Sequence, residues 1–472
     1  MRRASLLELR NFLLACALAA CLPACGENAP PKGSGVSGTG GGSARAGSGR
    51  IVVFGIDGAD WQVIEPLAAG GRLPHFKRLL EKGATGTLRS MEPSASPSLW
   101  TTIATGVRPE RHGIHGFVVE GGGGPGDAVH SEEGTAVAAG RRAEVRPVTS
   151  SMRRAPAFWN ILPRYDRKVG VVGWLVTWPA EETNGFIVSS YLPYIYNWST
   201  GRPLKGTIVS GIPRQTFPEA LIATLDSDKV KPGDVPEETV RRFYDPDRVR
   251  SLSQDDRDCV EGFLWSLACD ETYRRIGLRL FQEYPVDLFA IYFGGVDVAS
   301  HRFWKFAHPD ALDYHVGREE ASVLGRVIDE YYVYVDGLLG EYLERIGPDT
   351  TLVVLSDHGF KPVLFPGKPT TSGHHRMEGV IALFGRGVRP GRTIEGAGLL
   401  DVLPTLLYLL DLPLARDLEG KVLEDALDPD FVRGHRPNFV DSYGTPGRIP
   451  EADQTELDRN VLERLRSLGY IN

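Results

Sequence analysis

The chain has 472 residues, of which 42% are hydrophobic and 24% are charged. This composition is typical of a folded globular protein and excludes a disordered or fibrous one. The formal net charge of −7 argues against a protein that holds nucleic acid by bulk electrostatics, because such a protein needs an excess of Lys and Arg. One large domain, or two closely joined domains, is expected.

Residues 1–20 have the pattern of a secretory signal: a basic start and then the apolar run Phe12–Ala20, which is too short to span a bilayer as a helix. The run ends in small residues directly before Cys21, which resembles the lipobox of bacterial lipoproteins. We therefore expect an exported membrane lipoprotein that faces the periplasm or the cell exterior and is anchored through a lipidated Cys21. Cys25 is the alternative site, and an ordinary cleaved signal is the competing interpretation.

Composition divides the remainder of the chain. Residues 21–49 are rich in Gly and Ser and are predicted to form a tether. A folded domain is expected over 50–430, followed by a C-terminal tail over 431–472. Within the domain, 191–258 is poor in strand patterns and is interpreted as a cap insertion near the site. Its aromatic residues favour a small core of its own over a stacking surface for a base or sugar: Tyr191, Tyr194, Tyr196 and Trp198.

Short continuous apolar runs recur along the domain, as in strands that are buried on both faces of a parallel sheet. They are Ile51–Ile56, Lys168–Trp174, Val286–Phe293, Thr351–Leu355 and Val380–Phe384. Helical patterns lie between them, at Leu73–Lys82, Cys259–Tyr284, Ala321–Ile346 and Leu399–Leu410. The alternation predicts an α/β fold in which helices sandwich a mainly parallel central sheet, with ligands beyond the carboxyl ends of its strands.

Two cysteines, Cys259 and Cys269, lie in the predicted domain, both on one predicted helix. At a helical rise of about 1.5 Å per residue their Cα atoms would be about 15 Å apart, whereas a disulfide spans at most about 7 Å. We predict two buried thiols.

Side chains that bind metals adjoin four of the predicted strands. They are Asp57, the pair Asp297 and His301, the pair Asp357 and His358, and the pair His374 and His375. Taken singly, each Asp has an alternative as a helix cap and each His as a structural residue. Because strand ends of one sheet gather along one rim, we predict that three aspartates and three histidines surround two ions. A mixed carboxylate and imidazole shell suits zinc and comparable divalent metals.

Hydroxyl groups are concentrated at Ser94, Ser96 and Ser98, at the start of a helical run that ends at Thr105-Gly106. The N-terminus of a helix offers unpaired N–H groups and a positive dipole end, which suit a phosphate group. The alternative is a Ser N-cap with Pro in the first turn.

Several motifs then carry a family resemblance: IVVFGIDGAD, PSASPSLWTTIATGVRPERHGIHGF, RPVTSSMRRAPAFWNIL, DxxxH at Asp297, VVLSDHGF and HHRMEG. Together they resemble the alkaline phosphatase superfamily, specifically its type I phosphodiesterase and nucleotide pyrophosphatase branch. The motifs span most of the predicted domain, and the resemblance implies an alkaline phosphatase-like fold.

By position, the resemblance implies that Ser96 is the nucleophile, with Ser94 and Ser98 as competing choices. It implies two divalent ions, with zinc expected and manganese or iron as alternatives. The ligands that it implies for one ion are Asp57, Asp357, His358 and Ser96, and those for the other are Asp297, His301 and His375. His374 could exchange with His375.

The implied activity is hydrolysis of a phosphoric ester through a phosphoseryl intermediate, on a substrate linked to a nucleotide, sugar or lipid. A phosphomonoesterase would need an added phosphate clamp, for which Arg376 is the candidate. A phospho-group transferase of the same superfamily also stays open, and an inactive binding lipoprotein is the remote alternative. A formylglycine sulfatase is disfavoured, because Ala95 and Leu99 occupy positions where its motif needs Cys or Ser and Arg.

Overall fold

The structure is a computed structural model that describes residues 49–120, 145–193, 195–196, 206–207, 212–364, 372–447 and 449. The predicted signal, nearly all of the predicted tether and both candidate lipidation sites lie outside the described residues, as do Tyr194 and Trp198. Within the described ranges, no helix is both long enough and apolar enough to cross a bilayer.

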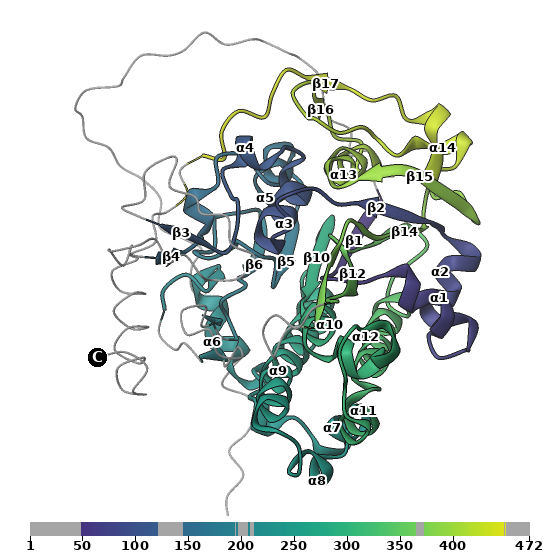
Figure 1. Cartoon of the computed structure of the whole chain (residues 1–472). Coiled ribbons are helices and arrows are strands. Elements are labelled where there is room, and N and C mark those ends of the chain that lie inside the picture. The colour runs from purple at the N-terminus through teal and green to yellow at the C-terminus, as the bar shows by residue number, and fades with distance from the viewer. Residues whose placement is uncertain are drawn as a thin grey trace, which may run out of the picture. The chain divides into compact units, whose positions relative to one another are not determined.

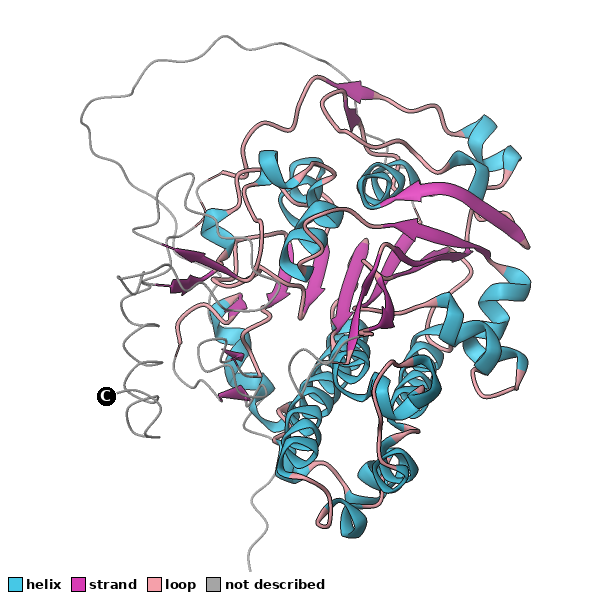
Figure 2. Cartoon of the chain, in the orientation of Figure 1, coloured by secondary structure: helices cyan, strands magenta, loops and turns pink. Residues whose placement is uncertain are grey.

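A nine-stranded sheet forms the centre of the fold (Figures 1 and 2). Its spatial order is β15 (Arg392–Gly398), β2 (Ala84–Arg89), β14 (Glu378–Gly385), β11 (Thr350–Leu355), β1 (Arg50–Ile56), β10 (Leu288–Phe293), β5 (Val169–Val172), β6 (Gly185–Val188) and β9 (Thr216–Phe217). The strands from β11 to β6 run parallel, while β14 and β9 are antiparallel to their neighbours. The predicted mainly parallel sheet is thus confirmed.

Helices cover both faces of the sheet, because the central strands bury alternate side chains on opposite sides. Val52, Phe54 and Ile56 of β1 belong to one hydrophobic core, and Ile51 and Val53 belong to the other. The first core is closed by α1 (Trp61–Ala69), α2 (Pro74–Lys82), α9 (Gln254–Glu283), α10 (Gly295–Ala307) and α12 (Val327–Leu343). The second is closed by α3 (Ser96–Thr105), α5 (Phe158–Ile161) and α13 (Val402–Leu409). The predicted sandwich is confirmed.

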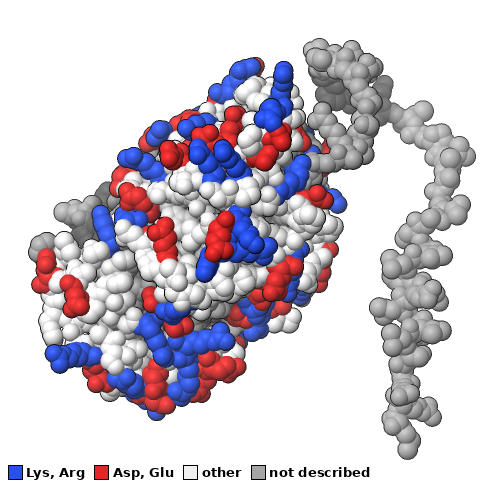
Figure 3. All heavy atoms as spheres, turned by 90° about the vertical axis from the view of Figure 1, so that its right-hand side faces the viewer, with Lys and Arg blue, Asp and Glu red and all other residues white. Residues whose placement is uncertain are grey.

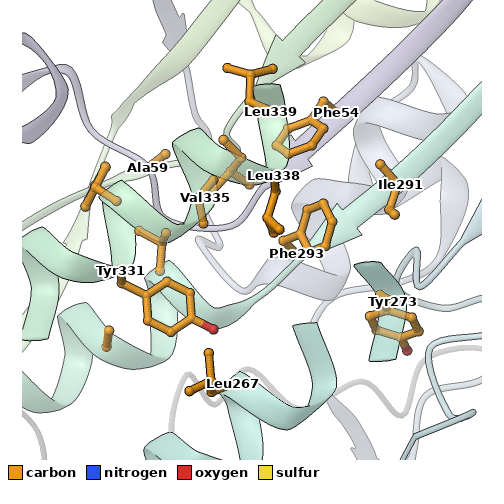
Figure 4. Packing of buried hydrophobic residues seen from close by; sticks show 14 of the residues in the cluster. Phe54, Ala59, Leu267, Tyr273, Ile291, Phe293, Tyr331, Val335, Leu338 and Leu339 are labelled. Atoms are coloured by element: carbon orange, nitrogen blue, oxygen red, sulfur yellow. The ribbon is translucent and has the colours of Figure 1, made fainter. Parts of the chain in front are cut away.

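Aromatic side chains fill the first core below the centre of the sheet (Figure 4). The rings of Phe54 and Phe293, on neighbouring strands, have centroids 5.1 Å apart. Leu338 and Leu339 of α12 lie next to them. This packing fixes β1 and β10 side by side, and the chemistry-bearing residues follow directly after both strands.

The remaining elements are short. The helices are α4 (Pro109–His112), α6 (Ile222–Leu225), α7 (Glu237–Phe243), α8 (Pro246–Val249), α11 (Arg318–Leu324) and α14 (Pro429–Gly434). Four two-stranded sheets pair β3 (Val118–Glu120) with β4 (Val145–Pro147), β7 (Ile195–Tyr196) with β8 (Gly206–Thr207), β12 (Gly359–Pro362) with β13 (Gly373–Arg376), and β16 (Leu414–Ala415) with β17 (Phe439–Val440).

Two elements differ from their predicted form. The helix predicted over Ala321–Ile346 is divided into α11 and α12, because Gly325 is the C-cap of α11. The strand predicted at Val380–Phe384 is β14, which runs antiparallel to β11. The β12–β13 hairpin connects these two strands and reverses the chain direction, so no crossover helix is needed.

Much of the described part of the predicted cap insertion packs onto the central fold. β9 pairs with β6 at the sheet edge. Leu221, Leu225 and Phe243 belong to the first hydrophobic core, with Phe54 of β1. Tyr191 stacks on Trp178, with ring centroids 5.5 Å apart. Of the four aromatic residues singled out in the sequence, Tyr191 is the one whose side chain the structure describes, and it packs against a residue outside the insertion.

The beginning of the predicted C-terminal tail also packs against the body. β17 pairs in parallel with β16, and Tyr443 is buried in the second core. The hydroxyl of Tyr443 accepts a hydrogen bond from the Ala415 amide. These contacts fasten the chain to the body as far as Tyr443.

Both domain cysteines lie on α9, which is continuous from Gln254 to Glu283. Both are free thiols; Cys259 is buried and Cys269 is half-buried. The absence of a bridge between them, predicted from helix geometry, is confirmed. Burial is complete only for Cys259.

Basic and acidic side chains are interspersed over the face seen in Figure 3. Among the described ion pairs, the Arg72 guanidinium, after α1, pairs with Asp329 and with Glu330 of α12, both at 2.9 Å. Such exposed pairs contribute at most about 1 kcal/mol each to stability. Because basic and acidic side chains are mixed on the face seen in Figure 3, it has no continuous patch of positive charge.

Candidate metal centre

Three parallel strands deliver the predicted ligands to one edge of the sheet. Ile56 of β1 lies opposite Phe293 of β10, and Gly55 lies opposite Leu355 of β11. Because these strands end at nearly the same level, the residues that follow them meet at that edge. Asp57 follows β1, the α10 helix with Asp297 follows β10, and Asp357 and His358 follow β11.

Two further ligands arrive from elements outside the sheet. His301 lies one helical turn after Asp297 on α10, so that both side chains lie on the same face of the helix. His375 lies on β13, which the β12–β13 hairpin folds back toward the same edge. The six predicted ligands are therefore brought together from β1, α10, β11 and β13.

These residues form two groups of three. Within each group, the three ligand atoms lie within 4.8 Å of one another. One group, fully buried, is Asp57, Asp357 and His358. The other, half-buried, is Asp297, His301 and His375. The two groups adjoin, because His358 Nε2 lies 3.7 Å from Asp297 Oδ1 and the rings of His358 and His375 stack with centroids 3.6 Å apart.

All three histidines turn their Nε2 atoms toward the centre. The Nδ1 atom of each lies within hydrogen-bond distance of a backbone carbonyl: Gly373 for His301, Ser94 for His375 and Gly359 for His358. Since a carbonyl can only accept, each Nδ1 carries a proton, and in the neutral imidazole Nε2 then has the lone pair that can bind a metal ion. Metal-binding histidines are typically held in this way.

With its histidines neutral, the centre consists of hydrogen-bond acceptors without matching donors. His301 Nε2 and His375 Nε2 face each other at 2.9 Å. Among the described residues, Asp297 Oδ1, Asp357 Oδ2 and His358 Nε2 are buried with no hydrogen bond of ordinary geometry. Buried lone pairs that converge in this way are unfavourable unless a cation lies between them. The converging oxygen and nitrogen atoms therefore fit two divalent metal ions as ligands.

The charges point in the same direction. Burial, and then the neighbouring charge of Asp57, raises the pKa of Asp357 well above its ordinary value. Burial lowers the pKa of His358, but Asp357 and Asp57 outweigh it and raise that pKa to about 10. Burial, and then the charge of His358, lowers the pKa of His375 to about 4. Without a metal, this carboxylate cluster would be neutralised by protons.

The loop after β1 approaches α10 closely, and glycine makes this approach feasible. Gly58 has φ of +71°, in the left-handed region. A Cβ atom there would lie 2.5 Å from the Phe360 ring and 3.0 Å from the Cα of Asp297. Gly58 thus allows the two ligand groups to adjoin.

Ser96 is the predicted hydroxyl that contacts the centre. It is the first residue of α3, is buried, and its Oγ donates to Asp57 Oδ1 at 3.3 Å. Ala95, rather than a serine, is the N-cap. The N–H groups of Ser98 and Leu99 both donate to the Ala95 carbonyl. The N–H groups of Ser98 and Leu99 are therefore paired within the first turn, whereas the sequence predicts unpaired donors at this helix end.

The competing residues are placed differently. Ser94 contributes its carbonyl to His375, and the hydroxyl of Ser98 is buried with no hydrogen-bond partner among the described residues. His374 precedes His375 on β13 but is not in either ligand group.

The proposed clamp residue is engaged elsewhere. Arg376 donates to Asp60 at 3.0 Å and pairs with Glu378 at 3.4 Å. Asp60 is fully buried and also accepts from the Phe360 amide. Neighbouring strand residues point to opposite faces, so Arg376 is directed away from the side on which His375 meets the centre. Arg376, the candidate clamp by its proximity to His375, is therefore paired with Asp60 and Glu378.

Sequence reasoning missed Asp270, which holds the start of α10. Its carboxylate accepts from the amides of Gly294 and Gly295 at 3.1 and 3.0 Å, and from the Tyr331 hydroxyl at 2.9 Å. These amides belong to the unpaired donors of the helix N-terminus. No sequence signal identifies Asp270, because it lies in the middle of the long helix α9.

We predict that Asp270 makes stability depend on pH. Burial raises its pKa from 3.8 to about 7, so the folded protein retains a proton that the unfolded chain has lost. The free energy of unfolding should therefore fall as the pH rises from about 4 through about 7, by on the order of 2–4 kcal/mol. Asp270→Asn should remove this part of the slope in urea titrations at pH 5 and pH 8. Equal slopes in the two proteins would contradict it.

Comparison with known families agrees with the site. Residues 51–390 match the family model described as type I phosphodiesterase / nucleotide pyrophosphatase. That range contains Ser96 and all six predicted ligands. A 2,3-bisphosphoglycerate-independent phosphoglycerate mutase from Prochlorococcus marinus subsp. pastoris is 31% identical over 130 residues, which cover 25% of this chain and 22% of the mutase. The match thus spans about a fifth of that relative's length.

Similar solved structures include two enzymes. An inactive variant of murine ectonucleotide pyrophosphatase / phosphodiesterase 5, in complex with AMP, has a TM-score of 0.46 and 12% identity, covering 80% of this chain and 100% of that chain. Phosphonoacetate hydrolase from Sinorhizobium meliloti, in complex with phosphonoformate, has a TM-score of 0.36 and 19% identity, covering 66% of this chain and 57% of that chain.

Proposed function

The chain belongs to the type I phosphodiesterase / nucleotide pyrophosphatase family, and from this premise we propose that it hydrolyses phosphoric esters at its metal centre with Ser96 as nucleophile. The observation that carries the proposal is the contact of the Ser96 hydroxyl with Asp57, at the edge of two adjoining ligand groups. One ion would be held by Asp57, Asp357, His358 and Ser96, and the other by Asp297, His301 and His375. Zinc, manganese and iron all accept this ligand chemistry.

When bound, two such cations lower the pKa of a hydroxyl nucleophile and neutralise charge on the phosphoryl group. The chain's own residues supply position. Asp57 Oδ1 holds the Ser96 hydroxyl at 3.3 Å, and burial of both side chains keeps bulk water from the nucleophile. Attack of the Ser96 oxygen on phosphorus forms a Ser–O–P bond and breaks the P–O bond to the alcohol of the ester, and the proton lost by Ser96 is balanced by the proton that the alcohol takes up. Water then cleaves the Ser–O–P bond, which releases the phosphate product and restores the Ser96 hydroxyl.

The substrate class we propose is a phosphodiester or pyrophosphate linked to a nucleotide, sugar or lipid. A monoesterase needs a group that clamps the additional terminal oxygen, and Arg376, the candidate for this role, is committed to Asp60 and Glu378. This pairing favours a diester. A phosphomonoesterase and a phospho-group transferase are the alternatives that the following assay separates.

The assay compares hydrolysis of bis-p-nitrophenyl phosphate and p-nitrophenyl phosphate by residues 50–472, with a metal-stripped sample and Ser96→Ala as controls. The proposal predicts faster turnover of the diester, lost in both controls. Preference for the monoester would replace the diesterase with a phosphatase. Two bound metals without turnover of either ester would favour the transferase, and a protein that neither binds metal nor turns over either ester would overturn the proposal.

We also propose that the chain is lipidated at Cys21 and acts from a membrane surface outside the cytoplasm. The support is the signal-like start and the small residues before Cys21. A Cys21→Ser variant is expected to lose incorporation of labelled fatty acid in a bacterial host and to leave the membrane fraction, whereas Cys25→Ser should keep both. The reverse result would assign the anchor to Cys25, and retention of label in both variants would contradict the proposal.

A further inference from the structure

The two oxygens of Asp57 have different partners. Oδ1 lies 3.3 Å from Ser96 Oγ and 3.2 Å from His358 Nε2, so it faces the centre. Oδ2 accepts two hydrogen bonds from outside the ligand groups, from the Tyr292 hydroxyl at 2.6 Å and from Trp100 Nε1 at 3.1 Å. Hydrogen bonds to a buried carboxylate are short and strong. One oxygen of Asp57 therefore faces the ligand groups, and the other is held by Tyr292 and Trp100.

Both donors are held rigidly. Trp100 of α3 is fully buried and Tyr292 of β10 nearly so. The Trp100 ring packs edge to face against Tyr292 and against Trp174, each with a centroid distance of 4.9 Å and an interplanar angle of 89°. Trp174 Nε1 also donates to the Trp100 carbonyl at 3.2 Å. The two donors thus have little freedom to follow Asp57 if its side chain rotates.

The backbone of β1 is adapted to this arrangement. A Cβ atom on Gly55 would lie 2.7 Å from the Trp100 ring, closer than real side chains approach. Glycine at position 55 therefore leaves the space in which Trp100 reaches Asp57, two residues further along the chain. The donor arrangement joins three elements that Figure 1 shows close together, β1, α3 and β10.

We propose that Tyr292 and Trp100 are positioning residues that hold Oδ2 of Asp57, so that Oδ1 alone binds the ion of the buried group and orients Ser96. This inference rests on the proposed two-metal function. Removing one donor would let the carboxylate rotate and would weaken that ion selectively. The ion held by Asp297, His301 and His375 would be little affected, because Asp57, whose oxygen both donors hold, belongs to the other ligand group.

The test replaces Tyr292 by phenylalanine, which removes only the hydroxyl group. Tyr342→Phe is the matched control: Tyr342 is a buried tyrosine as well, and its hydroxyl has no hydrogen-bond partner among the described residues. Zn²⁺ affinity of the full-length proteins is measured by competition with a chromophoric chelator. We expect one of two Zn²⁺ ions to bind about 10–100-fold more weakly in Tyr292→Phe, the other to be unchanged, and Tyr342→Phe to match the wild type.

Each other result has a definite meaning. Two ions bound by Tyr292→Phe as tightly as by the wild type would overturn the inference and leave the proposed function intact. Equal weakening of both ions would also overturn it, since a general structural role would then suffice. A wild type that binds none of Zn²⁺, Mn²⁺ and Fe²⁺ would instead overturn the proposed function. If Tyr292→Phe does not fold, Trp100→Phe removes the other donor, and the same comparison decides.

Discussion

The Ser96→Ala variant is expected to lose hydrolysis of phosphoric esters, with kcat reduced by on the order of 10⁴-fold or more, because removal of a covalent nucleophile leaves only binding and electrostatic catalysis. Steady-state kinetics on the better of the two nitrophenyl esters measures this loss. The fold should be preserved, since Ala95 and not Ser96 is the N-cap of α3.

The neighbouring serines provide matched controls. Ser98→Ala removes a buried hydroxyl that has no hydrogen-bond partner in the described structure. Ser94→Ala leaves the carbonyl that holds His375 in place. Both variants should keep kcat within about threefold of the wild type. Loss of activity in Ser98→Ala together with an active Ser96→Ala would assign the nucleophile to Ser98.

Removal of the divalent ions is expected to destabilise the protein as well as to abolish its activity. The centre brings three carboxylates together, two of them fully buried. Each ion whose free concentration is 100 to 1,000 times its dissociation constant stabilises the native state by about 2.7–4.1 kcal/mol. Urea titration before and after treatment with a chelator measures the difference. Adding Zn²⁺ or Mn²⁺ back should restore both stability and turnover.

The Asp357→Asn variant isolates the buried ion in the same experiment. Asp357 lies in the fully buried group. This variant should therefore lose the stabilisation supplied by the ion of that group and keep the stabilisation supplied by the ion of the half-buried group. Asp336→Asn is the control, because Asp336 is a buried carboxylate that accepts from the amides of His75 and Phe76, away from the centre. A chelator that leaves the stability of the wild type unchanged would contradict a structural contribution from the ions.

The sequence predicts the central strands well because their side chains are buried on both faces. β1, β10 and β11 are continuous apolar runs, which few other structures produce. β2 and β15 escaped prediction because they are partly exposed and contain polar residues: ATGTLR and RTIEGAG. Their place in the sheet is decided by tertiary pairing, with β2 between β14 and β15.

The predicted ligands come together for a reason that the sequence contains: they adjoin the ends of strands of one sheet, and parallel strands end along the same edge. The residues that support them follow no such rule. In the sequence, Tyr292 is one residue of an apolar run. Its hydrogen bond to Asp57 joins residues that are 235 positions apart. The direction of Arg376 likewise depends on the pairing of β13 with β12. Asp60 fixes this arrangement, because it accepts a hydrogen bond from the Phe360 amide of β12 and from Arg376 of β13. These roles need the strand register, which local patterns do not determine.

The most direct test of the two-metal account is anomalous diffraction from crystals of the Zn²⁺-loaded protein at the zinc absorption edge. The account predicts two anomalous peaks about 3.5–4 Å apart, one among Asp57, Asp357, His358 and Ser96 and the other among Asp297, His301 and His375. A single peak, or peaks away from these residues, would contradict it.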